Sequence, residues 1–330
     1  MLEHGGRLLR AVRQYGIARE SWLDLSSGIA PWPYPIPSIP VEAWARLPEA
    51  EDGLETAARR YYGTRDLLPV AGSQAAIQAL PHLRPCGRVG VLSPCYAEHP
   101  HAWQRAGHTL LELDETQVEA ALDSLDVLVL VNPNNPTGRR VPRDTLLAWR
   151  ARLAARGGWL VVDEAFMDNT PAHSVVDCTG LPGLIVLRSF GKFFGLAGVR
   201  LGCVCAEPAL LQRLADLLGP WTVSGPTRVL AQACFADDAA HQQQIARCAG
   251  ASQRLASLLA HHGLPAYGGC DLFQYVCSER AEHLHDFLAR RGILVRLFTQ
   301  PAAVRLGLPA CEADEQRLAD ALAAYQKETA

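Results

Sequence analysis

The sequence lacks the patterns that mark several common classes of protein. No apolar run reaches the roughly 20 residues that a transmembrane helix needs. The first ten residues contain no apolar core of the kind found in signal peptides. The net charge is −3 and no basic stripe stands out, so nothing indicates a nucleic-acid surface. These absences predict a cytoplasmic protein with neither a membrane nor a nucleic-acid partner.

Recognisable metal-binding patterns are also missing. The ten cysteines include no CxxC pair, and the eleven histidines include no HExxH spacing. Cys203 and Cys205 are spaced as neighbours on one face of a strand. Scattered cysteines in a cytosolic chain are more often small buried hydrophobic residues than ligands. We therefore expect no metal site.

What is present is a regular alternation of strand-like and helix-like segments. The length of 330 residues is enough for one large and one small domain. Helical patterns such as 143–156 and 208–218 separate the apolar runs, and this alternation predicts an α/β domain with a mostly parallel sheet. The short apolar runs, typical of buried strands, are Arg88–Leu92, Asp126–Val131, Trp159–Val162, Leu184–Leu187 and Leu201–Ala206.

The two ends of the chain differ from the middle. Five prolines between residues 31 and 40 predict an extended N-terminal arm. We expect the arm and part of the small domain at 1–40, a large domain at 41–230 and a small α+β domain at 231–330. In the last third, helical patterns cover 241–262, 281–290 and 313–327, and strand patterns cover 272–276, 294–297 and 303–306.

Polar residues follow three of the predicted strands where each strand ends. The first is followed by the loop Asn-Pro-Asn-Asn-Pro-Thr-Gly at 132–138, the second ends in Asp163, and the third runs into Ser189 and then Lys192. Open α/β sheets bind ligands at the carboxyl ends of their strands. Taken singly, these features could be a turn, a helix N-cap aspartate and a surface lysine.

Together the three strand ends supply complementary groups. A lysine in an apolar, glycine-containing segment can act as a nucleophile toward an aldehyde. A carboxylate at a buried strand end needs a partner, such as a cationic heterocycle nitrogen. Ser189 and Arg200 are the residue types that hold a phosphate dianion.

This combination resembles the fold type I pyridoxal-5'-phosphate (PLP) enzymes, the aspartate-aminotransferase-like or class I/II aminotransferase family. The resemblance rests on the 132–138 loop, the Asp-Glu-Ala-Phe strand end at 163–166 and the Ser-Phe-Gly-Lys segment at 189–192 followed by Arg200. These motifs occur in the family's order, and the resemblance covers essentially the whole chain. It implies a large domain with a mostly parallel seven-stranded sheet, a small α+β domain, PLP as cofactor and a homodimer.

The resemblance also assigns roles to individual residues. Lys192 would carry PLP as a Schiff base, and Asp163 would keep the ring nitrogen protonated so that the ring stays an electron sink. Asn135 would hydrogen-bond the ring oxygen O3', and Tyr96 would stack on the ring. The remaining cofactor-binding residues would hold the phosphate, partly through backbone amides at a helix N-terminus; they are Gly72, Ser73, Gln74, Ser189 and Arg200.

Within the family the chain is similar to two groups, the histidinol-phosphate aminotransferases and the threonine-phosphate decarboxylases of cobalamin biosynthesis. Three features favour the decarboxylases: His-Gly-Gly at 4–6 followed by Leu-Asp-Leu-Ser-Ser-Gly-Ile-Ala-Pro at 23–31, Phe166 where the aminotransferases carry a tyrosine, and the segments 189–198 and 218–226. The expected reaction is decarboxylation of L-threonine O-3-phosphate to (R)-1-aminopropan-2-yl phosphate. Two departures are Leu47, where relatives carry a tyrosine that reaches the partner's cofactor phosphate, and Arg7, where an asparagine is common.

Substrate contacts follow from the same resemblance. Arg305 would bind the α-carboxylate, and Arg296 would bind the phosphate, which carries a charge of about −1.5 to −2 at neutral pH. Each arginine could instead belong to a surface ion pair. The residues expected to close over the substrate are His4, Gly5, Gly28 and Ile29.

Two other functions stay open on the residues alone. Decarboxylation and transamination differ in which bond to Cα stands perpendicular to the cofactor ring, and no residue pattern fixes that torsion angle. Histidinol-phosphate aminotransferase is therefore one alternative. The other is a non-catalytic PLP-binding regulator, although such proteins usually append a DNA-binding module for which this chain has no room.

Overall fold

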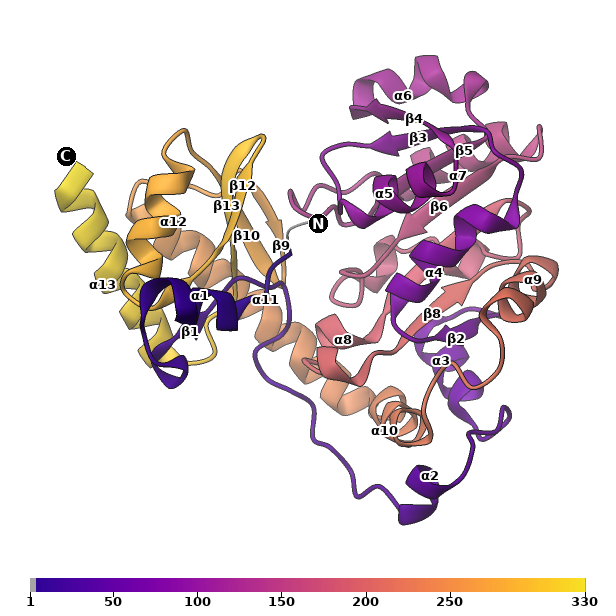
Figure 1. Ribbon diagram of the computed structural model, residues 1–330, viewed down its shortest axis with the longest axis horizontal. Coiled ribbons are helices and arrows are strands. Elements are labelled where there is room, and N and C mark those ends of the chain that lie inside the picture. Colours follow the sequence, from indigo (N-terminus) through magenta and orange to yellow (C-terminus); the bar gives the residue numbers. More distant parts are fainter. Residues whose placement is uncertain (1–3, 330) are drawn as a thin grey trace. The chain divides into compact units, whose positions relative to one another are not determined.

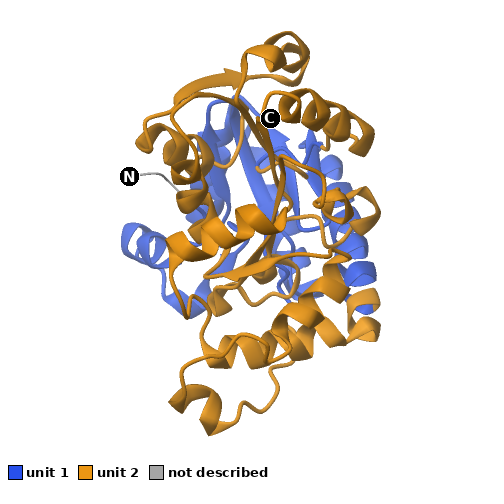
Figure 2. Cartoon of the chain, turned by 90° about the vertical axis from the view of Figure 1, so that its right-hand side faces the viewer, with its two compact units in different colours: residues 1–33, 136–139, 243–330 blue, residues 34–135, 140–242 orange. Residues whose placement is uncertain are grey.

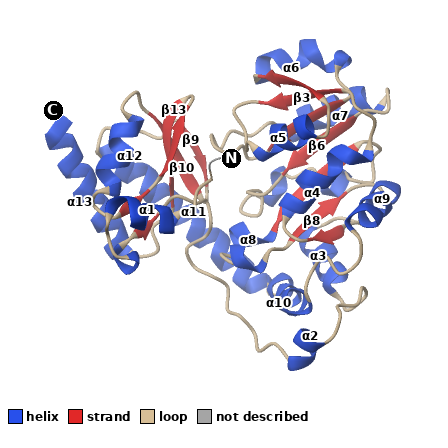
Figure 3. Cartoon of the chain, in the orientation of Figure 1, coloured by secondary structure: helices blue, strands red, loops and turns tan. Residues whose placement is uncertain are grey.

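The computed structural model describes residues 4–329, which divide into two compact units (Figure 2). The described parts of unit 1 are residues 4–33, 136–139 and 243–329, and unit 2 consists of 34–135 and 140–242. Each unit contains both strands and helices (Figure 3). The domain boundaries that the sequence suggests near residues 40 and 230 stay a prediction.

Unit 2 is built on a seven-stranded sheet within the described residues (Figure 1). Neighbouring strands are parallel from β7 to β4, whereas β8 is antiparallel to both of its neighbours, which confirms the mostly parallel α/β sheet. In spatial order the strands are β2 (Leu68–Val70), β8 (Gly202–Cys205), β7 (Leu184–Ser189), β6 (Trp159–Asp163), β5 (Val127–Val131), β3 (Arg88–Leu92) and β4 (Thr109–Leu113).

The sequence did not predict the two edge strands, β2 and β4. Strand β2 has three residues and contains Pro69, which an edge strand tolerates because one side of its backbone has no ladder to join. Strand β4 is largely half-buried or exposed, so it lacks the continuous apolar run of the central strands. Short, partly exposed edges leave a weak hydrophobic pattern.

Helices pack on the sheet through alternate strand residues. Val127 and Val129 of β5 share a buried cluster with Ala76 and Ile77, which belong to a helix that follows β2. All five residues of β5 are buried, as expected for a strand covered on both faces. Burying each such valine or leucine contributes about 1.5–3 kcal/mol. This packing fixes the positions of the carboxyl ends of the central strands.

The helices of unit 2 connect these strands and extend beyond them. They are α2 (Val41–Ala45), α3 (Leu54–Tyr62), α4 (Ser73–Ala79), α5 (Glu98–Arg105), α6 (Glu115–Ala121), α7 (Arg143–Ala154), α8 (Phe190–Phe193), α9 (Pro208–Leu218) and α10 (Gly225–Ala236). Helix α11 (Asp238–His261) begins in unit 2 and continues into unit 1. Short 3-10 turns lie at Arg19–Ser21 in unit 1 and, in unit 2, at Leu80–Leu83, Leu122–Ser124, Pro171–His173, Val176–Cys178 and Ala197–Val199.

Unit 1 contains a four-stranded antiparallel sheet and a two-stranded parallel pair within the described residues. The four strands are, in spatial order, β12 (Arg296–Thr299), β13 (Ala302–Gly307), β10 (Phe273–Cys277) and β9 (Gly268–Cys270). The pair is β1 (Leu23–Asp24) with β11 (Ile293–Leu294). The single strand expected over 294–297 is thus two strands in different sheets, because a strand pattern in one sequence does not show where the pairing partner changes.

The described part of unit 1 contains three further helices: α1 (Leu8–Tyr15), α12 (Ala281–Ala289) and α13 (Glu312–Thr329). Helix α1 was not expected from the sequence, and it buries Ala11 in a cluster with Trp22, Ala289 and Leu294. The proline-rich stretch at 31–40 contains neither helix nor strand, in agreement with the expected extended arm. Within residues 4–329, no helix has the length and apolar character to cross a membrane.

Candidate active site

The carboxyl ends of β5, β6 and β7 bring together the polar groups that the sequence singled out. The three strands are adjacent and parallel, and Asp163 is in register with Val131 on one side and Leu187 on the other. The loop at 132–135, the Asp163 carboxylate and the segment from Ser189 to Lys192 therefore leave the sheet at the same edge. Open α/β sheets bind ligands at such an edge.

Asp163 is buried and already holds two hydrogen-bond partners. Its Oδ2 lies 2.8 Å from Nε2 of His99, and its Oδ1 accepts a hydrogen bond from the amide of Ala165 at 3.0 Å. Only 3% of Asp163 and 1% of His99 is exposed. A carboxylate can accept about four hydrogen bonds. Asp163 thus has acceptor capacity for a further N–H group, such as that of a protonated pyridine ring.

His99 is a site residue that the sequence reasoning missed. It lies in the first turn of α5, three residues after Tyr96, and the two rings meet edge to face with centroids 6.2 Å apart. The contact with Asp163 joins residues 64 positions apart in the chain. Spacing along a single sequence carries no signal of such a contact.

Lys192 stands in a short helix that is fixed by aromatic packing. Phe190 and Phe194 stack with ring centroids 4.4 Å apart, and both are fully buried. The Lys192 side chain is only half-buried, and its Nζ lies 5.8 Å from the centre of the Phe166 ring. A primary amine held against an apolar surface in this way can serve as a nucleophile.

The phosphate-binding candidates converge around the start of α4. Gly72 has φ +71° and precedes the helix, and a Cβ at this position would lie 2.5 Å from a guanidinium nitrogen of Arg200. Ser189 pairs in register with Gly202, where a Cβ would lie 2.5 Å from the amide nitrogen of Ser73. The two glycines thus let an arginine, a serine and the first helical amides, which lack intrahelical partners, come close together.

Tyr96 is hydrogen-bonded to Gln74, which belongs to the first turn of α4. The Tyr96 hydroxyl donates to Oε1 of Gln74 at 3.3 Å, and Nε2 of Gln74 donates to Glu98 at 2.8 Å. Burial, with a smaller contribution from the Glu98 charge, raises the pKa of Tyr96 to about 12. The Tyr96 ring is therefore a neutral phenol at physiological pH. Gln74 contributes its side chain to this network, so only its backbone amide remains a phosphate-binding candidate.

Two asparagines hold the 132–135 loop in shape. Asn132 is fully buried, and its side-chain amide both donates to and accepts from the backbone of Val141, at 3.2 and 2.9 Å. Asn134 donates to the carbonyl of Pro94 at 2.8 Å. These bonds position Asn135, which is half-buried, at the end of the loop.

A buried ion-pair network joins Arg188 at the end of β7 to Glu164 and Asp168, which follow β6. Nη1 of Arg188 lies 2.8 Å from Glu164, and Nη2 lies 3.3 Å from Asp168. Burial raises the pKa of Glu164 above its ordinary value despite the nearby guanidinium. Burial would lower the pKa of Arg188, but Asp168 and Glu164 outweigh it and raise that pKa. The network fixes β6 and β7 next to Asp163 and Ser189.

Unit 1 carries the two arginines expected to bind substrate. Arg296 of β12 and Arg305 of β13 are directly opposite each other in register. Both guanidinium groups lie near the Phe298 ring, at 5.2 and 6.0 Å from its centre. Burial, with repulsion from Arg296 as a smaller cause, lowers the pKa of Arg305 to about 10. Arg305 therefore still carries its charge at neutral pH.

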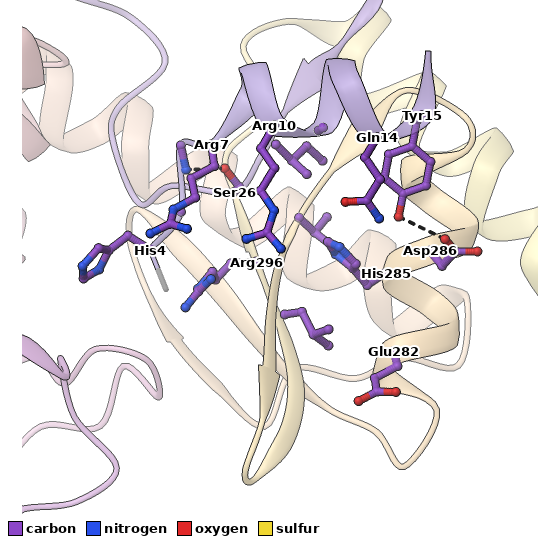
Figure 4. A pocket seen from close by; sticks show the side chains of 16 residues that line it. His4, Arg7, Arg10, Gln14, Tyr15, Ser26, Glu282, His285, Asp286 and Arg296 are labelled. Carbon is purple, nitrogen blue, oxygen red and sulfur yellow. Dashed lines mark hydrogen bonds between the residues drawn. The ribbon is translucent and has the colours of Figure 1, made fainter. Parts of the chain in front are cut away.

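The N-terminal segment lines a pocket in the same unit (Figure 4). The pocket has a volume of about 340 Å³ and includes His4, Gly5, Ser26 and Arg296. A Cβ on Gly5 would lie 2.2 Å from the carbonyl oxygen of Ser26, so only glycine fits there. Gly28 and Ile29 lie in the loop after β1 and are not among the residues that line this pocket.

The residues of unit 2 fit the parts of PLP. Asp163 offers a buried acceptor for the ring nitrogen, Lys192 offers an amine for the aldehyde, and Arg200 beside Gly72 offers a cation for the phosphate. Among residues 4–329, no group of three His, Cys, Asp or Glu side chains is placed to hold a metal ion.

Known proteins resemble this chain along nearly its whole length. A threonine-phosphate decarboxylase from Pseudomonas aeruginosa is 62% identical over 327 residues, with 99% of each chain covered. A threonine-phosphate decarboxylase from a Sinorhizobium species is 43% identical, with 97% of each chain covered. The solved structure of a histidinol-phosphate aminotransferase from Sinorhizobium meliloti, in complex with pyridoxal-5'-phosphate, has a TM-score of 0.75 at 21% identity, covering 99% of this chain and 88% of that one.

A family match covers most of the chain. Residues 46–322 match the family described as aminotransferase class I and II. The match includes all of the strand-end residues described above, from Tyr96 to Arg200, and both substrate-binding arginine candidates. The chain therefore belongs to the class I and II aminotransferase family of PLP-dependent enzymes.

Proposed function

We propose that the protein is a PLP-dependent decarboxylase of L-threonine O-3-phosphate. The bond between Cα and the carboxylate breaks, CO2 leaves and a proton is added at Cα. The product is (R)-1-aminopropan-2-yl phosphate, the aminopropanol unit of cobalamin biosynthesis. The absence of a spanning helix among the described residues is compatible with the cytoplasm as the place of this reaction.

The observation that carries this proposal is the cross-strand pair of Arg296 and Arg305. Directly opposite residues in antiparallel strands have Cβ atoms about 4.5–5.5 Å apart and side chains on the same face. Both guanidinium groups lie near the Phe298 ring, so the pair can bind a ligand that carries two anionic groups. L-Threonine O-3-phosphate carries an α-carboxylate and a phosphate on adjacent carbons. We assign the carboxylate to Arg305 and the phosphate to Arg296.

Similarity supports the choice of reaction. Relatives that match nearly the whole chain, at 62% and 43% identity, are named threonine-phosphate decarboxylases. The aromatic residue near Lys192 is Phe166, which has no hydroxyl group to donate to the cofactor oxygen O3'. Both observations favour the decarboxylase over the aminotransferase.

The chain's own residues have defined tasks in this reaction. PLP supplies the electron sink for the electron pair that decarboxylation leaves at Cα. Asp163, oriented by His99, holds a proton on the ring nitrogen, and Arg200 with Ser189 holds the phosphate. Lys192 binds the cofactor and provides an amine at the place where the substrate amine must react. Arg305 holds the carboxylate before it leaves.

We further propose that the protein is a homodimer. Apolar side chains around α2 are exposed in the single chain: Ile36, Val41, Trp44 and Leu47 are 64–74% exposed. Large apolar side chains exposed within one short segment indicate an interaction site, and a second copy of the chain would cover them. Light scattering on the purified protein should give about twice the 35.8 kDa mass of one chain, and Trp44→Glu should shift the protein toward monomer. A monomeric wild type would contradict the proposal.

A product assay separates the candidate functions. Purified holoenzyme is given L-threonine O-3-phosphate alone, and CO2 and 1-aminopropan-2-yl phosphate are measured. In parallel it is given histidinol phosphate, and pyridoxamine phosphate is measured. Release of CO2 from the first substrate supports the decarboxylase. Pyridoxamine phosphate without CO2 would instead identify an aminotransferase, and binding of PLP without turnover would identify a non-catalytic protein.

A further inference from the structure

Three aromatic side chains share one face of the unit 1 sheet with Arg296 and Arg305. Residues two positions apart in a strand point to the same face of a sheet, and so do residues directly opposite each other. Phe298 is therefore on the face of β12 that carries Arg296, which is opposite Arg305 of β13. Tyr275 of β10 is opposite Arg305 on the other side, and Phe273 precedes Tyr275 by two residues. The two cations thus lie on a surface rich in aromatic rings.

The Phe298 ring is close to both guanidinium groups. Its centre lies 5.2 Å from the guanidinium carbon of Arg296 and 6.0 Å from that of Arg305. Its other recorded neighbour is the Tyr275 ring, which it meets edge to face with centroids 5.8 Å apart. Arg305 also lies 4.9 Å from the centre of the Phe273 ring. Phe298 therefore connects the two arginines through one apolar surface.

Phe298 also differs from the other two rings in its accessibility. Phe273 and Tyr275 are 0% exposed, whereas Phe298 is half-buried. The residue opposite Phe298 is Ala303, whose small side chain leaves room for the ring to lean diagonally toward Arg305. The Phe298 ring thus keeps an apolar surface that a ligand held by the two arginines can contact.

The proposed substrate has an apolar group between its two anionic groups. With the α-carboxylate at Arg305 and the phosphate at Arg296, the atoms that join them are Cα and Cβ of the substrate. Cβ carries a methyl group, which gains free energy when it leaves water for an apolar surface. A ring near both guanidinium groups is suited to contact the part of the ligand between them, and therefore this methyl group.

We propose that Phe298 contacts the methyl group on Cβ of the substrate and so makes the site selective for L-threonine O-3-phosphate over similar phosphorylated amino acids. This inference rests on the proposed function for the assignments of the two arginines. L-Serine O-phosphate carries the same charged groups and lacks the methyl group. L-allo-Threonine O-3-phosphate has the same atoms, but its methyl group and hydrogen exchange places on Cβ when the carboxylate and the phosphate are held. Both compounds lose the contact with Phe298.

Two variants of Phe298 and one matched control test this role. Phe298→Ala removes the apolar surface, whereas Phe298→Leu keeps an apolar side chain and provides a test if Phe298→Ala does not fold. The control is Tyr267→Ala, which removes an aromatic ring of the same unit that is 77% exposed. All are prepared as holoenzymes, and the absorbance of bound PLP confirms that each is folded and loaded.

The first measurement is kcat/KM for the three phosphorylated compounds. In the wild type, the value for L-threonine O-3-phosphate should exceed the other two by about 10-fold or more, as expected for one methyl group in an apolar site. Phe298→Ala should reduce this preference to about 2-fold by slowing L-threonine O-3-phosphate alone, and Phe298→Leu should lie between. Tyr267→Ala should match the wild type. An equal fall for all three compounds in Phe298→Ala would show a structural role and overturn the inference, as would a wild type without the preference.

The second measurement is independent of turnover. Borohydride reduction fixes PLP to the holoenzyme so that no reaction occurs, and titration calorimetry then gives Kd for L-threonine O-3-phosphate and L-serine O-phosphate. If the wild type releases no CO2 from any of the compounds, the proposed function fails and these Kd values decide the inference. It stands if the reduced wild type binds L-threonine O-3-phosphate about 10-fold more tightly and reduced Phe298→Ala does not. Equal Kd values in the reduced wild type would then overturn it.

Discussion

Asp163 and His99 form a buried pair, with Oδ2 of the carboxylate 2.8 Å from Nε2 of the imidazole. The carboxylate ends β6, and the imidazole projects from the first turn of α5. The pair fixes the direction in which the remaining acceptor positions of Asp163 point. We therefore predict that His99 is a positioning residue that acts through Asp163.

Replacing Asp163 should lower kcat more than replacing His99. Asp163→Asn removes the charge that keeps the ring nitrogen protonated, and losing one member of a buried charged pair costs about 3–5 kcal/mol, so we expect kcat to fall roughly 150- to 5,000-fold. His99→Ala removes only one hydrogen bond to Asp163 and should reduce kcat about 10-fold, with KM unchanged. Steady-state kinetics with L-threonine O-3-phosphate measures both.

His99→Gln serves as the control for that experiment, since glutamine can still donate a hydrogen bond. It should recover most of the activity lost in His99→Ala. If His99→Ala and His99→Gln are equally impaired and both have lost PLP, His99 is needed for packing rather than for orienting Asp163.

Variants of Arg305 and Arg296 should differ in the substrates for which KM rises. Arg305→Gln should raise KM for L-threonine O-3-phosphate and for L-threonine alike, because both carry the α-carboxylate. Arg296→Gln should raise KM only for the phosphorylated compound. Each loss should be about 10-fold or more, as for a hydrogen bond to a charged group. Equal effects of both variants on L-threonine would contradict the separate assignments.

The Arg188 network should contribute strongly to stability. Arg188→Met leaves Glu164 and Asp168 buried without their cation, so the free energy of unfolding should fall by about 3–5 kcal/mol. The control is Arg254→Met, which breaks an exposed ion pair with Glu315 and should cost less than about 1 kcal/mol. Urea denaturation followed by tryptophan fluorescence measures both, and equal values would show that burial of the network adds nothing.

The ion pair between Asp52 and Arg228 predicts a loss of stability in acid. Burial alone would raise the pKa of Asp52, but hydrogen bonds from Arg228 and the Leu54 amide outweigh it and lower that pKa below 3.8. A lowered pKa in the folded state stabilises the fold above pH 3.8, and this contribution disappears as pH falls through the lowered value.

Comparison with Asp52→Asn isolates this contribution. The difference in free energy of unfolding between wild type and variant should be constant from neutral pH down to about 3.8 and should shrink below it. A difference that does not change with pH across this range would show that the Asp52 charge has no role.

The local sequence was sufficient to predict the central strands of the large sheet. Central strands such as β5 are continuous apolar runs, and the strand ends at Asp163 and Lys192 could be located from them. The rarity of lysine is a further signal for Lys192, because the chain contains only one other lysine, Lys327. A residue type this rare, placed at a strand end, is itself an indication of function.

Contacts between distant segments could not be predicted in the same way. The pairing of His99 with Asp163, the register of Arg296 opposite Arg305 and the division of 294–297 between β11 and β12 all depend on tertiary arrangement. Propensity and periodicity describe a segment and its immediate neighbours. Helix α1 was missed although Leu8, Ala11, Val12 and Tyr15 recur at the spacing of one helix face, because the pattern extends over only 8 residues.

The most direct test of the account is the yield of CO2 per molecule of 1-aminopropan-2-yl phosphate, measured with carboxyl-labelled L-threonine O-3-phosphate in three proteins. The wild type and Lys327→Ala, which changes the exposed lysine of α13, should both release one CO2 per product molecule. Lys192→Ala should release none above the uncatalysed background. Equal CO2 release by Lys192→Ala and the wild type, or product without CO2, would contradict the account.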